Sequence, residues 1–262
     1  MVLPVQEMLY IVSILYFAGA VFYLLGNYSG RISFFRLALW TSAAGGFCNF
    51  LAIMMRTIVA GRLPLANGYE FILSYVFVTV LLYLILERRS GSQRAGWMVM
   101  TLAAFLIVFV MANGQAQLTE AGNLMPALKS PWLAFHVVTA VLAYAGFTLA
   151  AGMALVDVMQ TKSEKRNDRV YVVVGAAFVM LTLSIVFGAV WAEQAWGTYW
   201  SWDPKEDWAL ISWIVYASYL HLHRRREWRG KRSNWMVIIG FLIVLFTFFG
   251  VNYLMSGLHS YA

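Results

Sequence analysis

Eight long apolar runs constrain the fold of this chain more than any other feature of its sequence. The runs cover residues 7–25, 37–55, 69–86, 96–112, 133–156, 170–190, 207–222 and 235–253. A helix needs about 20 mostly apolar residues to cross the hydrocarbon core of a bilayer, where only internal hydrogen bonds satisfy the backbone. The sequence therefore predicts an all-α, polytopic membrane protein with eight transmembrane helices.

The composition supports this fold class. Hydrophobic residues make up 61% of the chain and charged residues 12%, whereas soluble domains carry about 25% charged residues. No loop is long enough to hold a separate soluble domain, so we expect a single membrane domain over residues 1–262. The one cysteine, Cys48, lies inside an apolar run. Neither a disulfide nor a CxxC pair is therefore available, and any thiol chemistry belongs to a partner.

The basic residues are divided unevenly between the loops. Fifteen of the 19 lysines and arginines fall in alternate loops. They are Arg31, Arg36, Arg88, Arg89, Arg94, Lys162, Lys165, Arg166, Arg169, Arg224, Arg225, Arg226, Arg229, Lys231 and Arg232. Loops rich in Lys and Arg face the cytoplasm or its equivalent, so both termini are predicted to be external. The net charge of +7 therefore reflects membrane orientation and does not indicate nucleic-acid binding.

Tryptophan is concentrated in one predicted external segment. Residues 191–213 hold seven large aromatic rings within 23 residues. These are Trp191, Trp196, Tyr199, Trp200, Trp202, Trp208 and Trp213. An aromatic belt at the membrane interface would spread such rings over many helices. A concentrated set forms a broad apolar surface edged with N–H groups, which suits a large planar ligand such as haem.

Part of this segment has a purely structural explanation. In "DPKE", Asp203 is a good helix N-cap, Pro204 suits the first helical position, and Glu206 completes a capping box. We therefore expect a helix to begin here. Any one of the tryptophans, taken alone, is explained at least as well by an aromatic belt as by a ligand.

Two histidines are candidate axial ligands, because haem iron is usually held by histidine. His136 closely follows Pro131, so it lies near the external end of the fifth helix if Ser130 caps that helix. His259 lies just beyond the external end of the eighth helix. A single interfacial histidine is more often an ordinary hydrogen-bonding residue, but these two bracket the tryptophan segment on one predicted face.

The other two histidines lie toward the cytoplasmic side. His221 is 14 residues beyond Asp207, which is about 21 Å along a helix that rises about 1.5 Å per residue. An ionisable residue inside a span is a candidate functional residue, although the arginines that follow would also explain an interfacial histidine. His223 is expected to be a solvated loop residue.

Three blocks of the sequence resemble the CcsA/ResC family of System II cytochrome c biogenesis. They are "WGTYWSWDPKEDWALISWIVYASYLH", the terminal "FFGVNYLMSGLHSYA", and "PLANGYEF" at residues 64–71. Eight helices also match the core of that family. The "DPKE" ending is similar to CcsA rather than to the related CcmC and CcmF proteins. The membrane implied is the bacterial cytoplasmic (inner) membrane or a thylakoid membrane.

The resemblance implies the haem-handling subunit of a holocytochrome c synthase complex. Haem b is then held externally by the axial ligands His136 and His259 against segment 191–213. The implied haem-binding residues of that segment are Trp196, Trp200, Trp202, Asp203 and Trp208. His221 matches the intramembrane histidine of the family, which would hold haem iron transiently before export. A second intramembrane histidine is expected from a CcsB/ResB-type partner subunit.

The implied reaction is covalent attachment of haem to the CxxCH motif of apocytochrome c, with a thiol reductant system acting indirectly. The nearest alternative is a CcmC-like protein that delivers haem to a chaperone. A b-type electron carrier needs pairs of histidines at membrane depth, and only His221 is available. A transporter of another amphiphile would show interrupted helices and buried charged pairs, which are not plain in this sequence.

Overall fold

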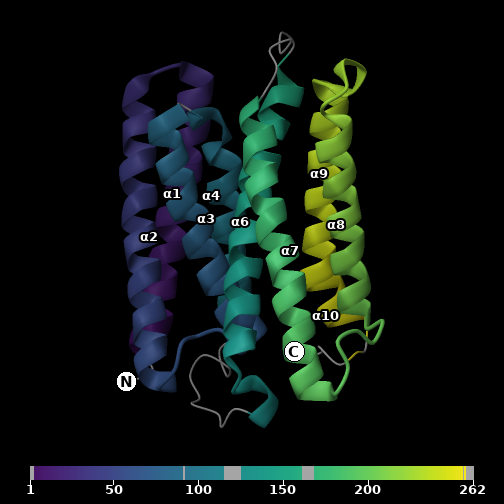
Figure 1. Cartoon of the computed structure of the whole chain (residues 1–262). Coiled ribbons are helices and arrows are strands. Elements are labelled where there is room, and N and C mark those ends of the chain that lie inside the picture. The colour runs from purple at the N-terminus through teal and green to yellow at the C-terminus, as the bar shows by residue number, and fades with distance from the viewer. Residues whose placement is uncertain (1–2, 91, 115–124, 161–167, 256, 258–262) are drawn as a thin grey trace. The chain divides into compact units, whose positions relative to one another are not determined.

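The computed structural model describes residues 3–90, 92–114, 125–160, 168–255 and 257, and within these ranges the chain is helical with no strand. The long helices are α1 (Leu3–Ser29), α2 (Ile32–Ala60), α3 (Gly68–Ser90), α4 (Gly96–Asn113), α6 (Pro131–Met159), α7 (Asp168–Trp196), α8 (Pro204–Leu222) and α9 (Lys231–Leu245) (Figure 1). A π-helical turn, Phe246–Gly250, links α9 to the short α10 (Val251–Leu254). Each predicted apolar run lies within these helices, so the all-α prediction is confirmed.

Seven of the described helices are long and apolar enough to cross a membrane: α1, α2, α3, α4, α6, α7 and the segment Lys231–Leu254. The seven support an integral membrane protein. The remaining helix, α8, has 19 residues, and three of its first four are Lys205, Glu206 and Asp207. The eighth span and the external position of both termini therefore stay predictions.

The helices form two compact units, Met1–Asn123 and Leu124–Ala262. In the first unit, α1 packs against α2 and α4, and α3 packs against the same two helices. In the second unit, α6 packs against α7 and α9, and α8 packs against α7 and α9 (Figure 1). All candidate ligand-binding residues of the sequence lie in the second unit. The single membrane domain over residues 1–262 stays a prediction.

Small residues bring α6 and α7 close together. A Cβ atom placed on Gly146 of α6 would lie only 2.7 Å from the Cβ of Ala177 on α7. Ala150 and Ala154, one and two turns further along α6, are fully buried. This spacing of small residues allows helix backbones to approach closely in membranes. The close approach fixes α6 against α7, and the first candidate ligand lies at this interface.

Candidate functional site

One end of the second unit gathers the starts of α6 and α8 and the ends of α7 and α10. It is called the tryptophan end here and comprises residues 125–136, 184–208, 246–255 and 257. The Ser130 side chain caps α6 by accepting a hydrogen bond from the Trp132 N–H at 3.3 Å. Its hydroxyl also donates to Gln194 Oε1 on α7 at 3.2 Å. The predicted cap of this helix is confirmed, and the cap joins α6 to α7.

His136 is oriented by Ser184 of α7. Its Nδ1 lies 2.8 Å from the Ser184 carbonyl oxygen and 3.2 Å from the Ser184 hydroxyl. A carbonyl oxygen only accepts hydrogen bonds, so Nδ1 carries the proton and Nε2 of the neutral ring carries the lone pair. Metal-ligating histidines commonly have this arrangement, in which a backbone carbonyl orients one ring nitrogen while the other binds the metal.

Gly188 provides the space in which the His136 ring lies. A Cβ atom on Gly188 would lie 2.7 Å from His136 Nδ1 and 2.9 Å from Cε1. The His136 ring is stacked with Trp191, with ring centroids 6.4 Å apart and an interplanar angle of 14°. Trp191 meets Trp196 edge to face at 5.8 Å. The structure thus places His136 beside Trp191, the first ring of the tryptophan segment, and Trp196 on Trp191.

Trp191 and Trp196 differ in how their indole N–H groups are satisfied. Trp191 is buried, and its Nε1–H donates to the Ala127 carbonyl at 2.8 Å. The Nε1–H of Trp196 is also buried, yet it has no hydrogen-bond acceptor among the described residues. A buried donor without a partner costs about 1–3 kcal/mol, which makes Trp196 a candidate donor to a bound ligand.

Trp202 is held in a strained and exposed conformation. Its φ of 58° is the only positive φ of a non-glycine residue in the described ranges, and a bulky residue rarely adopts this region. The side chain is 70% exposed and meets Trp200 edge to face at 5.9 Å. Tyr199 is 61% exposed. The loop before α8 therefore presents large rings at its surface.

The start of α8 fixes this loop through the predicted capping box. Asp203 Oδ1 accepts from the Lys205 N–H at 3.0 Å. Glu206 Oε2 accepts from the backbone N–H groups of Asp203 at 3.2 Å and Ser201 at 2.8 Å. The helix begins at Pro204, so the structural explanation of "DPKE" is confirmed. Asp203 and Glu206 anchor the strained loop.

Trp208 and Trp213 make different contacts from the other tryptophans. Trp208 packs on Phe246 of the π-helical turn, with ring centroids 4.3 Å apart. Trp213 Nε1–H donates to Thr182 Oγ1 of α7 at 2.9 Å. The tryptophans of the segment therefore fall into three groups: Trp191 with Trp196, Trp200 with Trp202, and Trp208 with Trp213 on helix contacts of their own. Trp191 is the member stacked with His136.

The two histidines at the far end of α8 differ in exposure, and in the opposite sense to the sequence prediction. His221 is exposed, whereas His223 is only 7% exposed. The His223 ring is stacked on Tyr171 of α7 at 4.9 Å and meets Tyr219 at 5.4 Å. The prediction that His223 is a solvated loop residue is wrong. Residues two apart on a helix lie on nearly opposite faces, so a buried His223 leaves His221 on the uncovered face.

His259 lies outside the described residues, and its role as a ligand stays a prediction. The last described residue is Gly257, two positions before it. A Cβ atom on Gly257 would overlap Asp203 Oδ2. The C-terminal chain therefore reaches the start of α8 immediately before His259.

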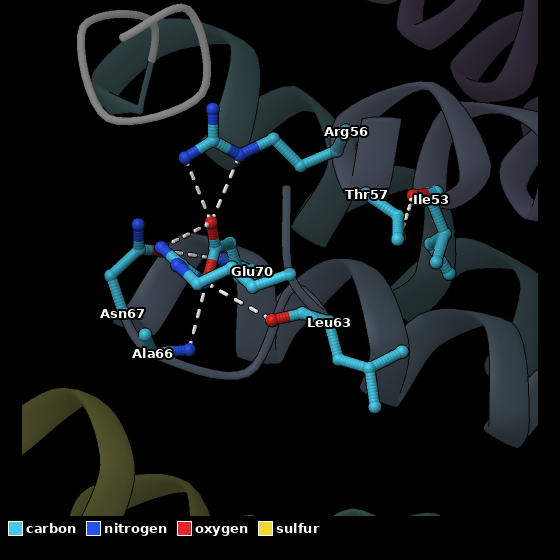
Figure 2. Close-up of polar contacts among 8 residues, drawn as sticks. Ile53, Arg56, Thr57, Leu63, Ala66, Asn67 and Glu70 are labelled. Carbon is cyan, nitrogen blue, oxygen red and sulfur yellow. Dashed lines mark hydrogen bonds and ion pairs between the residues drawn. The ribbon is translucent and has the colours of Figure 1, made fainter. Parts of the chain in front are cut away.

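A polar cluster in the first unit surrounds Glu70 of the "PLANGYEF" block (Figure 2). Glu70 is fully buried, and its carboxylate accepts from Arg56 Nε at 2.9 Å and from Arg62 Nη1 at 2.8 Å. It also accepts from the Ala66 N–H at 3.0 Å, while the Glu70 N–H donates to Asn67 Oδ1 at 2.8 Å. The cluster joins α2, the following loop and α3.

Arg56 and Arg62 lie outside the basic alternate loops of the sequence, and their pairing with Glu70 was not among the predictions. The sequence held one signal for this pairing, because a charge buried at the end of an apolar run requires an opposite charge nearby. Glu70 opens the third run and is the nearest acidic residue to both arginines in the sequence.

Known proteins resemble this chain in sequence and in fold. Residues 65–259 match the family described as cytochrome C assembly protein. The chain is 32% identical to the cytochrome c biogenesis protein CcsA of Guillardia theta, over 82% of each chain. It is 33% identical to CcsA of Prochlorococcus marinus, over 80% of this chain and 78% of that protein.

A solved structure shares the fold. The cytochrome c heme lyase CcmF is similar with a TM-score of 0.74 and 19% identity, over 95% of this chain and 46% of the CcmF chain. At that identity the likeness concerns the fold alone. The sequence matches carry the assignment: the chain belongs to the CcsA family of cytochrome c assembly proteins.

Proposed function

We propose that this protein holds haem b at the tryptophan end and presents it for covalent attachment to a CxxCH apocytochrome c. It acts with a CcsB/ResB-type partner as the haem-handling subunit of a holocytochrome c synthase. The observation that carries the proposal is the orientation of His136. Its Nδ1–H is bound to the Ser184 carbonyl, which directs the Nε2 lone pair to ligation beside Trp191.

The groups at the tryptophan end fit haem chemically. Haem iron binds neutral imidazole, and His136 has the required tautomer. The carboxylates of haem accept hydrogen bonds, and Trp196 has a buried N–H without an acceptor among the described residues. Haem also has a broad apolar face, and Trp200 and Trp202 provide rings at the surface of the adjoining loop. Each type of haem surface thus has a matching group.

Each residue then has a defined task. His136 and His259 provide the two axial imidazoles, and Trp196, Trp200 and Trp202 contact the macrocycle. Trp208 and Asp203, at the start of α8, hold the loop that carries Trp200 and Trp202 in place: Trp208 packs on Phe246, and Asp203 caps the helix. His221, exposed at the other end of α8, binds haem before it reaches the tryptophan end, at a site that a histidine of the partner subunit completes.

The protein contributes orientation rather than acid–base chemistry. Fixing a reactive edge of haem beside two thiols converts an encounter into a reaction between held groups. Such positioning can lower a barrier by about 7–11 kcal/mol. The proposed topology places the tryptophan end on the external side of a bacterial inner membrane or thylakoid membrane, where the apocytochrome is available.

The experiment is cytochrome c maturation in cells whose own pathway is deleted, with this chain and its partner subunit coexpressed. Covalent haem on the cytochrome is measured by haem staining of denaturing gels. We expect His136→Ala and His259→Ala to abolish attachment, and added imidazole to restore part of it by replacing the lost ligand. Normal attachment by both variants without imidazole would remove the proposed function.

A further inference from the structure

Arg62 lies in the loop between α2 and α3, where three hydrogen bonds hold its side chain. Nη1 donates to Glu70 Oε2 at 2.8 Å and to the Leu63 carbonyl at 3.1 Å. Nη2 donates to Glu70 Oε1 at 3.2 Å. Glu70 is fully buried, whereas the Arg62 side chain is 21% exposed. The guanidinium group of Arg62 is therefore held in one orientation at the edge of the polar cluster.

These bonds leave one edge of the Arg62 guanidinium group without an acceptor among the described residues. An arginine side chain has five N–H donors in one plane. The three bonds use both hydrogens of Nη1 and one of Nη2, so Nε–H and the second hydrogen of Nη2 remain. These two hydrogens lie side by side and form a fork that matches two oxygens of one phosphate or carboxylate group. Arg62 can therefore bind an oxyanion with two hydrogen bonds.

The charges of the cluster also favour an anion. The carboxylate of Glu70 is shared by two guanidinium groups, because Arg56 Nε donates to Glu70 Oε1 at 2.9 Å. Glu70 therefore neutralises the charge of Arg62 only in part. A partly buried cation attracts an anion more strongly than a cation in open water, because the local dielectric constant is lower.

The surroundings of Arg62 indicate the kind of anion. The segment Ile32–Ala60 is long and apolar enough to cross a membrane, so a residue two positions beyond its end lies at the depth of the lipid headgroups. The nearby side chains of Ile58 and Leu63 are 69% and 62% exposed. Acyl chains cover such apolar side chains in a bilayer, whereas a free inorganic anion makes no use of them. A phospholipid fits both the fork and its apolar neighbours.

We propose that Arg62, Ile58 and Leu63 form a binding site for one phospholipid. The phosphate of the headgroup accepts from Nε–H and Nη2–H of Arg62, and an acyl chain lies on Ile58 and Leu63. The bound lipid completes the hydrogen bonds of Arg62 and stabilises the loop between α2 and α3. The site lies in the first unit and does not depend on the proposed function.

The test is lipid binding to the full chain in mild detergent, measured by native mass spectrometry during titration with phosphatidylglycerol. We expect Arg62→Gln to weaken binding by at least about tenfold, because two charge-assisted hydrogen bonds are lost. Arg62→Lys should also weaken binding, since its ammonium group keeps the charge but has no fork. The double variant Ile58→Ser, Leu63→Ser should weaken binding and leave the bonds between Arg62 and Glu70 intact. It replaces the Arg62 variants if they do not fold.

Arg31→Gln is the matched control. Arg31 is an exposed arginine beside exposed Ile32 at the other end of α2, and no carboxylate of the described residues forms an ion pair with it. Its loss should leave lipid binding unchanged. Inorganic phosphate in large excess should not displace the lipid, because it has no acyl chain. Parent-like binding in the Arg62 and double variants, an equal loss in Arg31→Gln, or displacement by inorganic phosphate would each overturn the inference.

Discussion

The orientation of His136 depends on two residues of the neighbouring helix. Ser184 fixes the protonated nitrogen through its carbonyl oxygen, and Gly188 leaves room for the ring. Loss of a residue that orients a metal ligand typically lowers metal affinity by about 10- to 100-fold. Gly188 is therefore as important to this site as a residue with a functional side chain.

We predict that Gly188→Ala weakens haem binding by at least about tenfold. The new methyl group forces the His136 ring away from the Ser184 carbonyl, because the added Cβ would lie only 2.7 Å from His136 Nδ1. Haem titration of the purified complex measures the change. Gly175→Ala is the control on the same helix, since no atom lies within 4 Å of a Cβ there. Equal affinities for the two variants would contradict this role of Gly188.

Lys205 gives a prediction of pH dependence. Burial lowers the pKa of Lys205 from 10.5 to about 8, and the negative charge of Asp203 opposes this shift. Between these two pH values the unfolded chain binds the proton that the folded chain has lost. The free energy of unfolding therefore rises with pH through this window, by at most about 1.4 kcal/mol per pH unit.

Melting temperatures of the parent and Lys205→Met between about pH 7.5 and pH 10 measure this effect. The parent should gain stability relative to the variant as the pH rises, because the cost of burying a charged amine disappears. A parallel pH dependence in both proteins would show that Lys205 does not titrate in this range.

Single residues also show what a sequence pattern can and cannot predict. Ser130, Asp203 and Glu206 were predicted as caps because capping is local in sequence. His223 was misjudged because its burial depends on Tyr171, which lies on another helix. The grouping of the tryptophans was not predictable for the same reason, since Phe246 and Thr182 determine where Trp208 and Trp213 pack.

At the scale of elements, the Glu70 cluster links three consecutive parts of the first unit. One buried carboxylate accepts from arginines of α2 and of the loop that follows it. Removing one partner of a buried ion pair costs about 3–5 kcal/mol, because the remaining charge is left uncompensated. The connection between α2 and α3 should therefore depend strongly on this single side chain.

We predict that Glu70→Gln lowers the stability of the protein by about 3–5 kcal/mol. The amide keeps the shape of the side chain but removes the charge that Arg56 and Arg62 face. Thermal unfolding of the purified protein and the yield of folded protein report the loss. Glu227→Gln, at an exposed glutamate in the loop after α8, is the control and should be unchanged. A stable Glu70→Gln protein would mean that the arginines do not need this carboxylate.

At the scale of the whole molecule, the apolar runs predicted the helices well because the length of a span is a local property. The same criteria do not assign α8 as a span, because Lys205, Glu206 and Asp207 place three charged residues in its first turn. The proposed topology needs α8 to cross, because otherwise the tryptophan loop and the basic loop after α8 would lie on the same side.

Cysteine labelling tests this topology. In a Cys48→Ser background, we expect a membrane-impermeant maleimide added to intact cells or spheroplasts to label Tyr199→Cys and to leave Glu227→Cys unlabelled. Permeabilised cells should show labelling of both. Equal labelling of both positions in intact cells would mean that α8 does not span the membrane.

The ligation of haem by His136 and His259 is tested most directly by EPR and absorption spectroscopy of the complex purified with its partner subunit. The parent should contain low-spin haem with two axial imidazoles. His136→Ala and His259→Ala should each lose one imidazole and part of the bound haem, and added imidazole should restore the parent spectrum. Unchanged haem content and unchanged spectra in both variants would contradict the assignment of these two histidines.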